Sequence, residues 1–404
     1  MPAHSHAIAT LVLVLAALSG CVQMPGKSGS ANENREPAKT TSACPVCAGI
    51  ESAKPAEKPL QAAEWRDLTG WGEDQLGSAL VALTASCRNL GDQAIWSQVC
   101  REATEIQGQD NRALQIWFET RFKPWALTQP DGSRNGLVTG YYEPLIKGSR
   151  TSSNHYAHPV FAPPDDLITV DLAELFPELK HLRLRGRIEG RKLIPYYSRA
   201  EWTPQEATRT QGALAWVNDP LDLFFMQIQG SGQIQLPDGS RIRLNYADQN
   251  GHPYRSIGKW LIDQGYLKAD QASMQGIKAW AKANPARMTE MLNANPSMVF
   301  FRELSAQGSG PQGAMGISLT PERSIAIDPR HITLGAPVWL ATTRPNSDQP
   351  LNRLMVAQDT GGAIRGVVRA DFYWGSGNDA GSLAGRMKQQ GRMWVFMPRA
   401  FVPN

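Results

Sequence analysis

The chain has 404 residues, of which 42% are hydrophobic and 19% are charged, which is enough apolar material for two domains with cores of their own. Its 41 basic and 37 acidic residues give a net charge of +4. The basic residues form no long run and the aromatic residues follow no nucleic-acid-binding pattern, so nucleic acid is not an expected partner.

Residues 1–20 are predicted to be a signal peptide. The stretch 7–18 is apolar except for Thr10, a run too short for a bilayer span of roughly 20 residues. It is followed by Ser-Gly-Cys21, which resembles a bacterial lipobox, so Cys21 is expected to become the lipidated N-terminus; the alternative is an ordinary signal peptide with a chance cysteine. Val22, rather than an aspartate, follows the cysteine. By resemblance to known lipoproteins this implies an anchor in the outer membrane, on its periplasmic side.

Residues 21–61 are predicted to be a flexible, lipidated tether, because they contain almost no bulky apolar residues and cannot bury enough surface to fold. Four cysteines remain besides Cys21, an even number that suits an exported protein. Cys87 and Cys100 are expected to form a disulfide in the folded region, worth roughly 3 kcal/mol in loop-entropy models. Cys44 and Cys47 are expected to form a local disulfide, with a redox motif or half of a zinc site as the alternatives.

The folded region is predicted to begin with helices and to continue mainly as strands. Apolar residues at helical spacing over 76–87 and 114–122 predict helices before Pro124. Residues 233–244 predict a β-hairpin around Asp238-Gly239, and residues 257–264 and 274–292 predict two further helices. From Val299 onward short strands dominate, including 337–342 and 354–358. The periodicity therefore predicts a mainly β fold with several helices.

Three aspartates, Asp359, Asp371 and Asp379, lie among glycines and aromatic residues near the C-terminus, a pattern that suggests a carbohydrate-active site. Alternation over residues 367–374 predicts a strand with Asp371 on the same face as Arg369. Apolar surroundings raise the pKa of a carboxyl group, as a general acid working near neutral pH requires. The alternative is a simple ion pair between Asp371 and Arg369.

The other two aspartates have structural explanations. Asp359 opens the turn Asp-Thr-Gly-Gly, where a short acceptor hydrogen-bonds its own turn backbone, so we expect it to shape the site. Asp379 precedes a predicted helix whose free amides it can cap. Asp371 is therefore the candidate proton-transfer group.

The three-aspartate block resembles part of a known protein family, and five segments upstream of it also resemble that family and occur in the same order. They are TGYYEP at 139–144, LIPYYSRAE at 193–201, DLFFMQIQGSG at 222–232, NGHPYRSIGK at 250–259 and NPSMVFF at 295–301. From about Trp65 to Pro398 the chain resembles the membrane-bound lytic murein transglycosylase A family. The family's single catalytic acid/base matches Asp371. Glu143 and Asp379 stand where the family does not require a carboxylate, so neither is taken as catalytic.

The resemblance implies a double-psi β-barrel domain formed by residues 62–144 and 299–404, the latter being the three-aspartate part. A second, smaller β-barrel domain is inserted at 145–298, and the substrate groove lies between the two domains.

It also implies an enzyme, a peptidoglycan lytic exotransglycosylase, which is a carbon–oxygen lyase acting on a polysaccharide. Such an enzyme cleaves the β-1,4 bond between N-acetylmuramic acid and N-acetylglucosamine and leaves a 1,6-anhydromuramoyl end. Hydrolytic glycosidases use two carboxylates, whereas here the C6 hydroxyl of the muramic acid is the nucleophile and one aspartate suffices. No metal or organic cofactor is expected, since the His and Cys residues show no ligand spacing. Expected partners are peptidoglycan glycan strands, the outer membrane through the lipid anchor, and cell-wall synthesis or division proteins.

A glycan groove needs aromatic and hydrogen-bonding groups and close approach of the backbone. The candidates for substrate contact are Thr139, Tyr141, Tyr142, Gln229, Gly230, Ser231 and Asp359. Each has a structural alternative, such as a buried tyrosine or a glycine required by the backbone. Tyr254 and Arg255 are expected to position the helix that follows them. Two other functions stay open: a hydrolase with Glu143 or Asp359 as a second carboxylate, and a non-catalytic peptidoglycan-binding lipoprotein.

Overall fold

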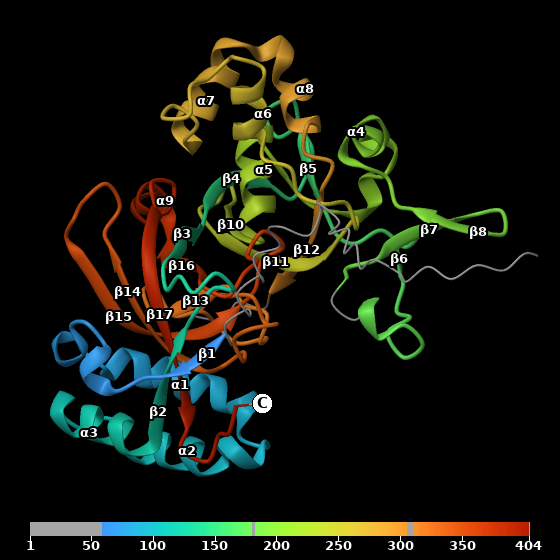
Figure 1. The fold of residues 1–404 in the computed structure, drawn as a ribbon. Coiled ribbons are helices and arrows are strands. Elements are labelled where there is room, and N and C mark those ends of the chain that lie inside the picture. The colour runs from blue at the N-terminus through green and yellow to red at the C-terminus, as the bar shows by residue number, and fades with distance from the viewer. Residues whose placement is uncertain (1–58, 180–181, 305–309, 404) are drawn as a thin grey trace, which may run out of the picture. The chain divides into compact units, whose positions relative to one another are not determined.

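The computed structural model describes residues 59–179, 182–304 and 310–403, shown as coloured ribbon in Figure 1. The predicted signal peptide and Cys21, Cys44 and Cys47 lie outside these residues. Strand β1 (Leu60–Ala62) pairs with β2 (Phe122–Leu127), so the tether predicted for residues 21–61 must end before Leu60. In the described part of the chain, no helix combines the length and the apolar character needed to cross a membrane.

The first helices come where helical spacing predicted them: α1 (Gly77–Leu90), α2 (Ala94–Glu105) and α3 (Asn111–Arg121). The side chain of Asp110 caps α3 by accepting the N–H of Ala113 at 2.8 Å, as short acceptors at helix starts commonly do. α3 ends at Arg121 because the next residue already opens β2. A disulfide between Cys87 and Cys100 joins α1 to α2, with the two Cα atoms 5.4 Å apart.

An eight-stranded sheet forms the larger core. Its further strands are β3 (Gly136–Glu143), β13 (Ser324–Ala326), β14 (Pro337–Thr343), β15 (Pro350–Asp359), β16 (Arg369–Ser376) and β17 (Lys388–Pro398). The order is β1-β2-β17-β14-β15-β13-β16-β3, and β17 also pairs with β3. The pairings of β3, β16, β13, β15, β14 and β17 therefore close into a ring.

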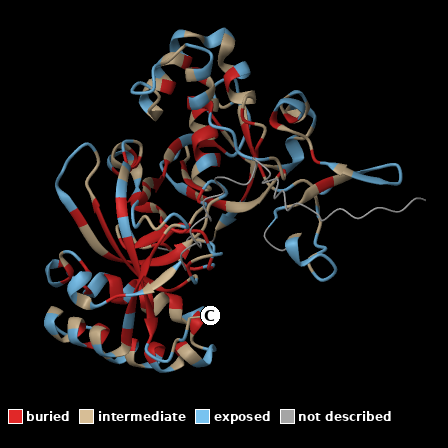
Figure 2. Cartoon of the chain, in the orientation of Figure 1, coloured by how far each residue is buried: buried red, intermediate tan, exposed pale blue. Residues whose placement is uncertain are grey.

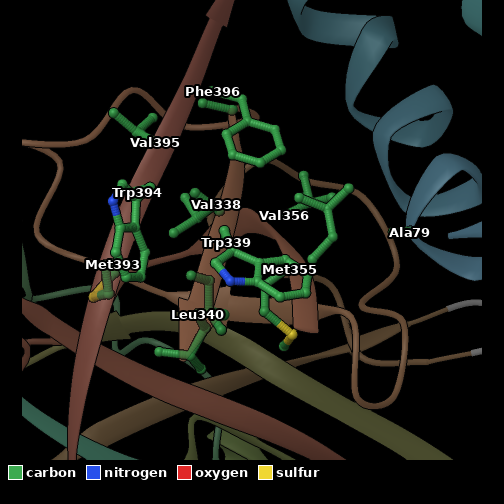
Figure 3. Close-up of a cluster of buried hydrophobic side chains, with 14 of the residues drawn as sticks. Ala79, Val338, Trp339, Leu340, Met355, Val356, Met393, Trp394, Val395 and Phe396 are labelled. Atoms are coloured by element: carbon green, nitrogen blue, oxygen red, sulfur yellow. The ribbon is translucent and has the colours of Figure 1, made fainter. Parts of the chain in front are cut away.

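Long stretches of these strands are buried, as Figure 2 shows in red, and in β14 the burial is nearly continuous. Val338, Trp339 and Leu340 of β14 have no exposed surface, and Figure 3 shows them packed among side chains of β15 and β17 beside Ala79 of α1. A strand covered on both sides carries an unbroken apolar run instead of an alternating one, which explains why this part of the sequence is so hydrophobic.

A six-stranded sheet has the order β12-β11-β10-β4-β9-β5. Its strands are β4 (Leu145–Ser149), β5 (His158–Phe161), β9 (Ala213–Val217), β10 (Ser231–Gln235), β11 (Arg241–Gln249) and β12 (Val299–Leu304). Strands β10 and β11 are the predicted hairpin, with Gly239 at a φ of 85° in its turn. Strand β12 pairs with β11, so this sheet continues past residue 298, where the inserted domain was predicted to end.

Three short strands, β6 (Ile168–Thr169), β7 (Arg185–Glu189) and β8 (Lys192–Pro195), form a separate sheet. The remaining helices are α4 (Arg199–Trp202), α5 (Pro220–Gln229), α6 (Ile257–Asp263), α7 (Met274–Ala283), α8 (Met288–Asn293) and α9 (Gly377–Ala384). The prediction of a mainly β fold with several helices is confirmed.

Two helix predictions were wrong in detail. Residues 274–292 do not form one helix, because Pro285 lacks the N–H that a continuing helix needs and starts a short 3₁₀ turn between α7 and α8. Asp379 does not cap α9: Ser376 is the residue before its first turn, and Asp379 lies inside that turn. There its negative charge still suits the positive end of the helix dipole.

Candidate active site

Asp371 lies in the middle of β16, between β3 and β13. It pairs with Thr139 on one side and with Ala326 on the other. Ala370 and Phe372 are fully buried on the opposite face, so the alternation predicted from the sequence holds. The hydroxyl of Thr139 donates a hydrogen bond of 2.6 Å to Oδ1 of Asp371, which fixes the carboxyl group against a neighbouring strand.

Arg369 is linked to Asp371 through the same threonine. Its Nη2 donates to Oγ1 of Thr139 at 2.9 Å, and its Nη1 donates to the backbone oxygen of Ala370. Burial raises the pKa of Asp371 above its ordinary value, while the Thr139 hydrogen bond and the charge of Arg369 oppose that rise. Asp371 therefore keeps its proton to a higher pH than an exposed aspartate would.

Asp359 ends β15 on the other side of β13. Both aspartates pair with Ala326, Asp359 from β15 and Asp371 from β16. The two carboxyl groups are close enough for the charge of Asp371 to raise the pKa of Asp359.

The carboxylate of Asp359 is held by three donors. Its Oδ1 accepts the N–H groups of Thr360 and Ala314 at 2.8 and 2.9 Å, and its Oδ2 accepts the hydroxyl of Tyr141 at 3.1 Å. The bond to Thr360 is the turn contact expected from the sequence. Despite these bonds, burial raises the pKa of Asp359 to about 6, and the charge of Asp371 adds to the rise.

Tyr141 supports the aspartate pair from β3. Its ring lies 5.2 Å from that of Tyr373, which pairs with it on β16, and both rings are buried with Leu319 and Ile364. Burial and the two nearby carboxylates raise the pKa of Tyr141 well above its ordinary value. Its hydroxyl therefore stays protonated and remains a donor to Asp359.

Glu143 joins the two large sheets and is fully buried. Its Oε1 lies 2.7 Å from Nε of Arg243 on β11. Its Oε2 accepts hydrogen bonds from Ser376 at 2.6 Å and from Gln233 at 2.7 Å. Enclosed by these partners, Glu143 has the position of a structural link and not that of a carboxylate that activates water.

The other candidate sugar contacts lie away from the face of Asp371. The N–H of Tyr142 donates to Oε1 of Gln229 at 3.0 Å, and the Tyr142 ring packs so tightly on Gly381 that an added Cβ would lie 2.7 Å from it. Gly230 ends α5 in the left-handed conformation, with a φ of 76°. Ser231 is buried at the start of β10.

The raised pKa of Asp359 predicts a pH-dependent stability. The folded protein holds this proton to about pH 6, whereas the ordinary value is 3.8, so between these values the folded state binds more protons than the unfolded state. The free energy of unfolding therefore falls as the pH rises through this window. We expect Asp359→Asn to reduce that fall by on the order of 1 kcal/mol, measured from urea unfolding at pH 4 and pH 6.5.

Asp379→Asn is the matched control for this experiment, because it makes the same chemical change at an exposed position on α9. An equal reduction in Asp379→Asn, or none in Asp359→Asn, would contradict the assignment of the pH dependence to Asp359.

Several contacts of the site could not be predicted from the sequence, although Thr139 itself was a candidate residue. Ala314 donates to Asp359 across 45 positions, Thr139 donates to Asp371 across 232, and Arg243 reaches Glu143 across 100. Within the described residues, no group of three or more His, Cys, Asp or Glu side chains is arranged to hold a metal ion. The chemistry that this arrangement offers is proton transfer by a half-buried carboxyl group.

Two protein-family models match consecutive parts of this chain. The MltA specific insert domain matches residues 137–302, and the 3D domain matches residues 323–397. Membrane-bound lytic murein transglycosylase A of Escherichia coli K12 is 34% identical over 319 residues, which are 77% of this chain and 78% of that protein.

Solved structures show the same fold. The crystal structure of MltA from Neisseria gonorrhoeae superimposes with a TM-score of 0.74 at 39% identity, covering 85% of this chain and 94% of that one. E. coli MltA with bound chitohexaose gives a TM-score of 0.65 at 29% identity, covering 85% and 96%. This chain therefore belongs to the membrane-bound lytic murein transglycosylase A family.

Proposed function

We propose that this chain is a peptidoglycan lytic transglycosylase that cleaves the β-1,4 bond between N-acetylmuramic acid and N-acetylglucosamine. The observation that carries the proposal is Asp371, a carboxyl group with a raised pKa, fixed by Thr139 on a rigid strand. Family membership and the chitohexaose bound to the E. coli relative support a glycan substrate.

In the proposed reaction, Asp371 donates its proton to the glycosidic oxygen as the bond from that oxygen to C1 of the muramic acid breaks. The resulting carboxylate accepts the proton of the C6 hydroxyl, whose oxygen forms the new bond to C1. The product is a 1,6-anhydromuramoyl end, and no water is consumed. The group must act as an acid and then as a base, which favours a pKa close to the working pH.

One carboxylate carries this mechanism because the other two nearby have different duties. Asp359 accepts three hydrogen bonds that hold the turn after β15, the loop at Ala314 and Tyr141. Glu143 is enclosed by Arg243, Gln233 and Ser376. A hydrolase would need one of them to activate water, and their contacts favour the single-aspartate reaction instead.

The proposal includes the surroundings of the site. The closed ring of strands is the double-psi β-barrel, the six-stranded sheet belongs to the inserted domain, and the glycan lies between them. Thr139, Tyr141 and Asp359 shape the site at Asp371. Tyr142, Gln229, Gly230 and Ser231 shape the groove at the junction of β3, α5 and β10. Lipidation of Cys21 holds the enzyme at the outer membrane, facing the periplasm.

The products distinguish this reaction from hydrolysis. Purified protein is incubated with purified sacculi, and the released muropeptides are analysed by mass spectrometry. We expect disaccharide products lighter by one water than those of a hydrolase, because an internal hydroxyl takes the place of water. Products with reducing ends would instead show that the protein is a hydrolase. Sacculi that stay intact would favour a non-catalytic peptidoglycan-binding protein.

A further inference from the structure

A cationic pocket of about 190 Å³ lies beside the aspartate pair. Thr360 and Gly361, which directly follow Asp359, line it together with Arg183, Arg330 and Arg365. Arg365 belongs to the loop that connects β15 to β16 and therefore links the two aspartates. The pocket therefore has room for water or for one small polar group.

Arg330 is held in place by the buried carboxylate of Asp328. Asp328 has no exposed surface, and it accepts the N–H of Gly366 at 2.9 Å and Nη2 of Arg330 at 2.5 Å. The hydrogen bonds from Arg330 and Gly366 outweigh burial and lower the pKa of Asp328 far below its ordinary value. Asp328 is therefore ionised and fixes both Arg330 and the 360–366 loop.

The pocket keeps an excess of positive charge. Asp328 neutralises one of the three guanidinium groups, and it lies 3.9 Å from Arg365, whose side chain is 43% exposed. Arg183 stands over the ring of Tyr246 at 5.6 Å, and in the described part of the chain it forms no ion pair with a carboxylate. Three guanidinium groups thus share one buried carboxylate, which leaves the pocket with an excess of positive charge.

We propose that this pocket binds a free carboxylate of a stem peptide carried by the glycan strand, and this inference rests on the proposed function. Guanidinium groups bind carboxylates in a planar, two-pronged geometry. The sugar backbone of a peptide-bearing glycan strand is neutral. It therefore offers no anionic group that could bind in a cationic pocket next to the cleavage site. The peptide substituents carry the carboxylates and leave the strand at the muramic acid, the sugar whose bond is cut.

The test measures ligand binding to the full-length protein in an Asp371→Asn background, so that the ligand is not cleaved. Arg365→Gln and Arg183→Gln each remove one positive charge from the lining of the pocket. Arg112→Gln removes the same charge from the exposed surface of α3 and is the matched control. The probes are a peptidoglycan tetrasaccharide with its stem peptides, the same tetrasaccharide after removal of the peptides, and neutral chitohexaose.

We expect each pocket variant to raise the Kd for the peptide-bearing tetrasaccharide roughly ten-fold, the effect of one charge-assisted hydrogen bond. The Kd values for the other two probes should stay unchanged, and Arg112→Gln should behave as the parent. Raised salt should weaken the parent's preference for the peptide-bearing probe.

Removal of the peptides frees the lactyl carboxylates of the muramic acids, so equal weakening for the peptide-free tetrasaccharide would overturn the peptide's own carboxylate as the specific ligand. Unchanged binding of every probe would overturn the anion site itself. Either result leaves the proposed function standing if the protein with Asp371 intact still releases anhydro products from sacculi. Failure of that separate reaction would instead remove the proposed function.

Discussion

Asparagine in place of Asp371 is expected to lower glycan cleavage by about 10³- to 10⁴-fold, because general acid and base catalysis by one group contributes on that order. Asparagine has no acidic proton for the glycosidic oxygen and cannot take the proton of the C6 hydroxyl. The measurement is the rate at which soluble muropeptides are released from sacculi. A variant that keeps the parent rate would contradict the assignment of Asp371 as the acid.

The same substitution should leave the fold intact. Asparagine retains an oxygen that can accept the hydroxyl of Thr139, which now donates to Oδ1 of Asp371 at 2.6 Å. Burial raises the pKa of this carboxyl group, so its ionised form is disfavoured in the folded protein. Replacing the carboxyl group by a neutral amide should therefore not lower the free energy of unfolding at neutral pH. We therefore expect an unfolding free energy equal to or above that of the parent. Asp379→Asn, exposed on α9, is the matched control and should keep its activity.

The local part of this site could be predicted from the sequence. The alternation of residues 367–374 placed Asp371 on one face of a strand with Ala370 and Phe372 on the other, and β16 has this arrangement. A strand repeats every two residues, so neighbours along the chain decide which way a side chain points. The Asp-Thr-Gly-Gly turn could be predicted for the same reason, because its hydrogen bond is local: the N–H of Thr360 donates to the side chain of Asp359.

The partners across strands could not be predicted in this way. Thr139 and Asp371 are 232 positions apart, and their contact depends on the parallel register of β3 with β16. Local periodicity contains no information on register between distant strands. Ala326 illustrates the consequence: an ordinary alanine in the sequence becomes the residue that pairs with both aspartates. Pro285 differs, because it is a local signal from which the break between α7 and α8 could have been predicted, although the helix was expected to continue to residue 292.

The second large effect is expected at a buried ion pair far from Asp371 in the sequence. Arg323 and Asp74 have side chains that are 4% and 5% exposed. Nη1 of Arg323 donates to Oδ2 of Asp74 at 2.6 Å, and Nη2 donates to Oδ1 at 2.8 Å. The remaining donors of Arg323 bond to Ser78, Gln75 and Leu354, which uses the full capacity of five N–H groups.

Removing one partner should therefore be costly. Asp74→Ala leaves a buried guanidinium group without its counter-ion, and we expect the free energy of unfolding to fall by about 3–5 kcal/mol. The double variant Asp74→Leu with Arg323→Met buries apolar groups in place of two charges and should lose less stability than Asp74→Leu alone or Arg323→Met alone, as a double-mutant cycle of urea unfolding experiments would show. Additive losses would mean that the two side chains do not act as a pair.

Loss of the ion pair should also lower activity, because Arg323 lies next to a strand of the active site. Arg323 immediately precedes β13, the strand whose Ala326 pairs with both Asp359 and Asp371. Asp74 also accepts the N–H of Leu354 on β15 at 2.8 Å, so the ion pair fixes β13 against β15 from the side of the N-terminal helices. We expect Asp74→Ala to lower the rate of glycan cleavage even at temperatures where the variant remains folded, and the double variant to recover part of that rate. Full activity of folded Asp74→Ala would show that β13 keeps its place without the pair.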